Sequence, residues 1–136
     1  SYQIKKIEDV YAFSKYKPVL TRGELYWSIA HLFVVMFFLL DLFARLGSLS
    51  FYEIFAYGSY VFLTIYALTD LMDKHKWNFI IEMLRVIATS LIFVWTGDWF
   101  GHNILPFIIG YHCMAFFFSF SVYKSNGQNN TVIAFK

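Results

Sequence analysis

The chain has 136 residues, of which 59% are hydrophobic, 23% aromatic and only 15% charged. Soluble domains carry about 25% charged and about 45–50% apolar residues, so this composition argues against an ordinary soluble domain. The net charge of +2 is too small to favour nucleic acid as a partner. The single cysteine, Cys113, excludes a disulfide within the chain.

Residues 1–23 form a polar and basic segment, which we expect to lie at a membrane interface. Ile4, Ile7 and Val10 recur at helical spacing. They predict either a short helix on the membrane surface or a solvated tail whose periodicity is accidental. The sequence begins with Ser1 rather than Met, so we expect a processed chain or part of a longer one.

Four long apolar stretches follow, at residues 24–46, 51–72, 77–100 and 104–123. Each has about the 20 residues that a helix needs to cross roughly 30 Å of hydrocarbon. Thr21 and Glu24 match a capping box at the start of the first stretch. Because the connections are short, neighbouring spans must run in opposite directions. The sequence therefore predicts an all-α membrane protein, with an up-down-up-down four-helix bundle at 24–123 and a polar tail at 124–136.

Lys and Arg residues are distributed unevenly around these spans. Nine of the eleven lie in residues 1–23, in the connection at 73–76 or in the tail, and these three regions share one side of the membrane in the predicted topology. Basic residues gather on the cytoplasmic side of membrane proteins. We therefore expect both termini to face the cytoplasm, with the protein in an inner or plasma membrane or in an endomembrane.

The third stretch contains two charged residues, Glu82 and Arg85, which are three apart and share a helix face. Asn78 extends this face, and Asp70 and Asp73 lie near the end of the preceding stretch. Ionisable residues inside a membrane are costly and need partners. We predict that Arg85 pairs with Glu82 and with Asp70 or Asp73. The five residues would form a structural polar clamp between spans two and three, with a functional site on the same face as the alternative.

Two histidines, His31 and His112, lie within spans and are candidate haem ligands. Counted along each helix, His31 lies roughly 10 Å and His112 roughly 18 Å from the cytoplasmic edge. Two axial ligands need similar depths, so the spacing favours interhelical hydrogen bonds over haem. The four histidines show no i, i+3 or i, i+4 pair, and we predict no metal site. We also find no catalytic constellation and expect no enzyme activity from this chain as given.

Several short motifs in residues 15–101 point to a known family: Lys15-Tyr16-Lys17-Pro18, Leu25-Tyr26, Leu68-Thr69 with Asp73, and Glu82-x-x-Arg85. Together they resemble the C-terminal membrane region of the sterol desaturase/fatty acid hydroxylase superfamily, and the alkylglycerol monooxygenase-like members most of all. That resemblance implies a relationship to membrane di-iron oxygenases that act on lipids, whose iron is held by histidine boxes preceding such a region.

This chain lacks every one of those histidine boxes. The resemblance therefore implies either the accessory membrane part of such a protein, with di-iron only if a missing upstream part exists, or a relative that never had the catalytic core. The resemblance assigns no catalytic residue to this chain. For Asp73, Glu82 and Arg85, which match positions of the pattern, it implies a structural role.

Three functions remain open at this point. The first is a non-catalytic membrane domain or subunit related to lipid hydroxylases. The second is a small accessory subunit of a larger membrane complex, such as a respiratory assembly. The third is a haem- or quinone-binding electron carrier that uses His31 and His112. The expected partners are membrane lipids and either other membrane subunits or a missing N-terminal catalytic part.

Overall fold

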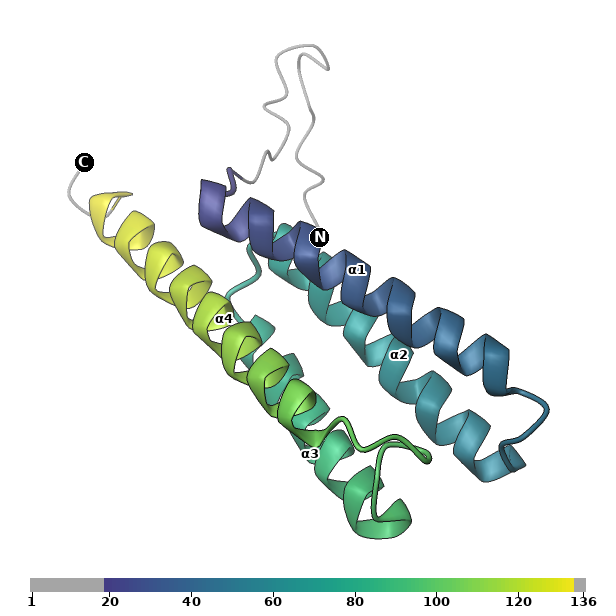
Figure 1. Ribbon diagram of the computed structural model, residues 1–136. Helices are drawn as coiled ribbons and strands as arrows, with labels where there is room; N and C mark the ends of the chain where they lie inside the picture. The colour runs from purple at the N-terminus through teal and green to yellow at the C-terminus, as the bar shows by residue number, and fades with distance from the viewer. Residues whose placement is uncertain (1–18, 134–136) are drawn as a thin grey trace, which may run out of the picture.

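The computed structural model describes the backbone of residues 19–133 and the side chains of residues 19–125. This part of the chain is helical, with α1 at Arg22–Arg45, α2 at Phe51–Met72, α3 at Asn78–Thr96 and α4 at Leu105–Ile133 (Figure 1). All four helices are long and apolar enough to cross a membrane. The all-helical architecture with four candidate spans is thus confirmed. Most of the predicted interfacial segment, residues 1–18, lies outside the described residues.

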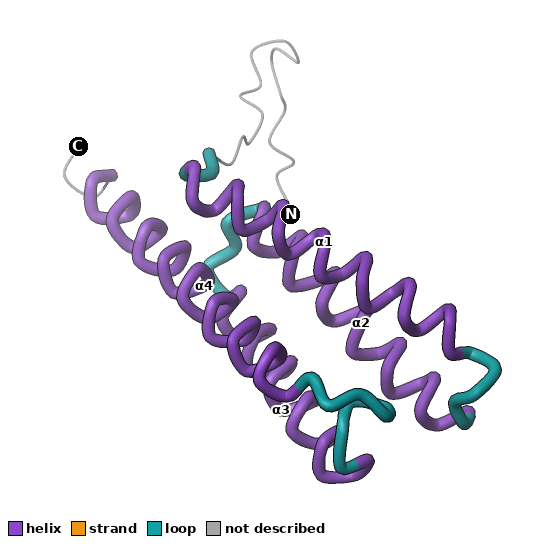
Figure 2. The backbone as a smooth tube through the Cα atoms, viewed as in Figure 1, coloured by secondary structure: helices purple, strands orange, loops and turns teal. Residues whose placement is uncertain are grey.

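The helices lie side by side with short connections between them (Figure 2). Each helix contacts the next one along the chain. Aromatic side chains also join α1 to α4, because Trp27 stacks on Phe118 with ring centroids 5.3 Å apart and contacts Tyr111 at 5.9 Å. The four helices therefore form one bundle, and side chains from all of them can meet in its interior.

Two helices begin with a reciprocal capping box. At α1, the Thr21 N–H donates to Glu24 Oε2 at 2.6 Å and the Glu24 N–H donates to Thr21 Oγ1 at 3.3 Å, which confirms the predicted box. Ser50 and Glu53 make the same arrangement at α2, at 2.7 and 3.4 Å. Such boxes satisfy N–H groups that have no partner within the helix.

The connection between α3 and α4 differs from the prediction. The third helix ends at Thr96 rather than near Phe100, because Gly97 adopts a left-handed conformation with φ of 82° and its N–H donates to Phe93 O at 2.9 Å. Left-handed glycine is a common helix stop. The chain then folds back, so that Trp99 is fully buried against Phe38, Tyr57 and Tyr60. The connection thereby closes one end of the bundle.

The fourth helix is longer than its apolar stretch. It continues past Tyr123 into the polar segment and ends at Ile133, while the part suited to crossing a membrane ends at Ser125. Ser, Asn and Gln do not prevent a helix from continuing, and this segment contains no proline. The polar tail is therefore in large part a helical extension of the last span.

Candidate functional site

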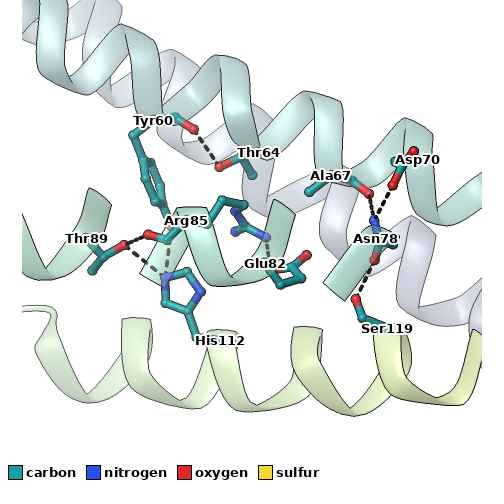
Figure 3. Close-up of polar contacts among 10 residues, drawn as sticks. All are labelled: Tyr60, Thr64, Ala67, Asp70, Asn78, Glu82, Arg85, Thr89, His112 and Ser119. Carbon is teal, nitrogen blue, oxygen red and sulfur yellow. Dashed lines mark hydrogen bonds and ion pairs between the residues drawn. The ribbon is translucent and has the colours of Figure 1, made fainter. Parts of the chain in front are cut away.

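The inner face of α3 carries a row of buried polar side chains: Asn78, Glu82, Arg85 and Thr89. They are four, three and four residues apart, which places them on one helix face. The row faces side chains of α2 and α4, which carry their own polar groups (Figure 3). A polar row buried against neighbouring helices is what a membrane bundle needs to keep such groups out of lipid.

Asn78 joins three helices at one end of this row. Its Nδ2 donates to Ala67 O at 3.0 Å and to Asp70 Oδ2 at 3.4 Å, both on α2, and its side-chain oxygen accepts a hydrogen bond from Ser119 on α4. Asp70 also lies 3.2 Å from His75 Nδ1. The described contacts of Asp70 are thus with Asn78 and His75 rather than with Arg85, while Asp73 caps the end of α2. Asp70 therefore does not meet Arg85, and α2 is joined to this end of the α3 row through Asn78.

Glu82 and Arg85 form an ion pair in the middle of the row. Arg85 Nη1 lies 2.7 Å from Glu82 Oε2, and the two side chains are 0% and 2% exposed, respectively. The guanidinium carbon lies 4.8 Å from the ring centroid of Tyr111 and 5.7 Å from that of Tyr60. Contacts of this kind between a cation and aromatic rings are favourable, and more so away from water. The charge of Arg85 is therefore balanced by one carboxylate and surrounded by two aromatic rings.

His112 lies beside this pair and bonds to α3. Its Nε2 is 3.0 Å from Thr89 Oγ1 and 3.5 Å from the Tyr60 hydroxyl. Thr89 has one hydroxyl hydrogen, which it donates to the Arg85 carbonyl at 2.9 Å. The other ring nitrogen, Nδ1, is buried and has no hydrogen-bond partner among the described residues.

His31 of α1 belongs to the same neighbourhood. Its ring is fully buried and contacts Tyr111 at a centroid distance of 5.4 Å, and Tyr111 contacts His112 at 5.6 Å. The depths counted along each helix did not suggest that the two histidines share a neighbour. Such counting ignores how far α1 and α4 are shifted along each other, which only tertiary packing decides.

Six buried polar atoms in this neighbourhood have no hydrogen-bond partner within the described part of the chain. They are Arg85 Nε and Nη2, both ring nitrogens of His31, Nδ1 of His112 and the hydroxyl of Tyr111. Each buried polar atom left unpaired costs about 1–3 kcal/mol. We call Glu82, Arg85, Thr89, Tyr60, Tyr111, His31 and His112 the polar core.

A second polar cluster lies at the end of the bundle that the α3–α4 connection closes. Asp41 of α1 accepts a hydrogen bond from the Tyr57 hydroxyl at 2.8 Å and lies 3.3 Å from His102 Nε2. Arg45 Nη1, one turn further along α1, is 3.8 Å from the same carboxylate. At the opposite end, the buried carboxylate of Glu24 lies 3.1 Å from Lys74 Nζ. These contacts hold the connections against α1.

Among residues 19–125, no three His, Cys, Asp or Glu side chains are grouped so that they could hold a metal ion. His31 and His112, the candidate haem ligands, are both packed against Tyr111. Comparison of the chain with protein-family models, curated proteins and solved structures found no match in any of the three.

Proposed function

We propose that this chain is a non-catalytic membrane domain or subunit related to lipid hydroxylases. The observation that carries the proposal is the Glu82–Arg85 ion pair, with its 2.7 Å contact inside the bundle. These are the two charged residues of one of the motifs that carry the resemblance, and Arg85 also contacts the rings of Tyr60 on α2 and Tyr111 on α4. The buried contacts of the Glu82–Arg85 pair are enough to explain its position, without a role in a reaction.

The outer surface of the bundle favours a role in association. Only 22–39% of the apolar part of each candidate span is buried within the described structure. Large side chains such as Phe33, Phe55, Val94 and Phe117 face outward. Lipid can cover such a surface, and so can other membrane helices. This observation supports the second candidate, an accessory subunit of a larger membrane complex, as well as the first.

The native particle, purified in mild detergent, is expected to weigh more than one chain. Native mass spectrometry, with iron and haem analysis on the same sample, checks this. A longer chain that carries histidine boxes and bound iron would support the hydroxylase relationship. Larger partner subunits, in the absence of such a longer chain, would support the accessory role. A chain of this length that binds iron by itself and oxidises a lipid would contradict both. A Soret band lost on substituting His31 or His112 would favour the electron carrier instead.

We further propose the up-down-up-down topology with both termini in the cytoplasm. It is supported by the excess of Lys and Arg in the regions that this topology places on one side. Short connections between consecutive spans favour the same arrangement. The α2–α3 turn, with Lys74 and Lys76, is then cytoplasmic, and the α1–α2 turn with Ser48 lies on the other side.

Cysteine labelling in spheroplasts of a bacterial expression host tests this topology. In a Cys113→Ser background, Ser48→Cys is expected to react with a membrane-impermeant maleimide, because its side chain is exposed in the α1–α2 turn. Lys76→Cys, which is equally exposed, is expected to react only after the membrane is permeabilised. The reverse pattern would place the termini outside, and labelling of both sites in sealed spheroplasts would contradict the alternation of spans.

A further inference from the structure

The six polar atoms without partners gather around one side chain, Tyr111. The guanidinium of Arg85 lies over its ring, and the rings of His31 and His112 contact it from α1 and from its own helix. We infer that the polar core is a binding site for an uncharged hydroxyl group, supplied either by a water molecule or by an alcohol with an apolar tail.

The charges of the polar core require an uncharged ligand. Arg85 and Glu82 already neutralise each other at 2.7 Å, and neither side chain is accessible to solvent. An added anion would leave an unbalanced charge inside a membrane, where charges are costly. A neutral group that only forms hydrogen bonds avoids this cost.

The donors and acceptors of the polar core select a hydroxyl among neutral groups. Arg85 Nε and Nη2 can only donate, so the ligand must accept. A neutral histidine ring has one nitrogen that accepts, and both ring nitrogens of His31 lack a partner among the described residues, so the ligand must also donate. A carbonyl oxygen accepts but cannot donate. A hydroxyl does both, and the Tyr111 hydroxyl can complete the set in either role.

An apolar groove on the surface of the bundle shares one residue with the polar core. It lies between α2 and α3, has a volume of about 410 Å³, and is lined by Ala56, Ser59, Tyr60, Leu63, Ala88, Leu91, Ile92 and Trp95. Tyr60 belongs both to this groove and to the polar core, since its hydroxyl lies 3.5 Å from His112 Nε2. A ligand with its tail in the groove would therefore bring its hydroxyl to the Tyr60 side of the core.

Two probes distinguish an alcohol from water in the protein reconstituted in phosphatidylcholine nanodiscs. The first is a hexadecanol that carries a diazirine, compared with the matching diazirine hexadecane, which lacks the hydroxyl. The second is magnetisation transfer from water to the Arg85 side-chain nitrogens, measured by solid-state NMR. Preferential labelling by the alcohol at residues of the groove or core supports an alcohol ligand, and transfer without such preference supports water.

Tyr111→Phe serves as the test variant, because the hydroxyl that it removes makes no hydrogen bond with the described residues. We expect alcohol labelling, or the water transfer, to fall about fivefold to tenfold, the size of effect that follows from losing one buried hydrogen bond. Tyr57→Phe is the control, since its hydroxyl bonds to Asp41 in the other cluster and its loss should leave both signals unchanged. The absence of both alcohol preference and water transfer in the wild-type protein would overturn the proposal. Signals that Tyr111→Phe does not reduce would overturn it as well.

Discussion

Replacing Arg85 with leucine is expected to destabilise the helix bundle by about 3–5 kcal/mol, the usual effect of breaking a buried ion pair on one side. The substitution leaves the Glu82 carboxylate buried beside apolar and aromatic groups without the cation that now lies 2.7 Å away. Thermal unfolding in detergent, followed by size-exclusion chromatography, measures the loss. A variant that remains assembled at the wild-type midpoint would contradict a structural role for the pair.

The double variant Glu82→Leu/Arg85→Leu is the matched control. It removes both charges together, and replacing a whole buried pair by apolar residues is often neutral or stabilising by about 1–4 kcal/mol. We expect the double variant to recover most of the stability that Arg85→Leu loses. Equal instability of the two variants would mean that Arg85 acts through its other contacts, namely the rings of Tyr60 and Tyr111.

Replacing Trp99 with alanine is expected to cost about 3–5 kcal/mol, as large-to-small substitutions of buried aromatic residues do. The side chain is fully buried, and its ring contacts those of Phe38, Tyr57 and Tyr60, at centroid distances from 4.7 to 5.5 Å. Its removal would leave a cavity where the α3–α4 connection closes the bundle. Thermal unfolding in detergent again provides the measurement.

Trp95→Ala is the control for that experiment. Trp95 lies one turn earlier, in the last turn of α3, and is 56% exposed on the outer surface. Its replacement should change the unfolding midpoint by much less than the loss of Trp99. Similar effects of the two substitutions would show that hydrophobic surface in general, rather than closure of the bundle end, sets the stability.

The sequence was sufficient to predict the features that depend on local spacing. Long apolar stretches predicted four helices, and Thr21 with Glu24 predicted the capping box of α1. The three-residue spacing of Glu82 and Arg85 predicted a shared helix face, and the two side chains are in contact. The last two inferences involve residues within one helical turn, where geometry is fixed by the helix itself.

Features that depend on how helices are shifted along each other were not predictable from the sequence. The bridge from Asn78 to Ala67 and Ser119 links positions 11 and 41 residues apart. The shared contact of His31 and His112 with Tyr111 is of the same kind. The end of α3 was mispredicted for a different reason: Trp99 and Phe100 look like a continuation of an apolar span, but Gly97 stops the helix and the two aromatic residues turn inward.

The polar row on α3 has a consequence for how the protein is made. A single Arg at the middle of a helix adds about 2.5–3.5 kcal/mol to the cost of entering the bilayer from the insertion machinery. Outside α3, the side chains that surround Arg85 are Tyr60 of α2 and Tyr111 of α4. Insertion of the α3 segment into the bilayer is thus less favourable without those neighbours. We therefore expect α3 to insert more stably when α2 is already in the membrane and α4 follows it.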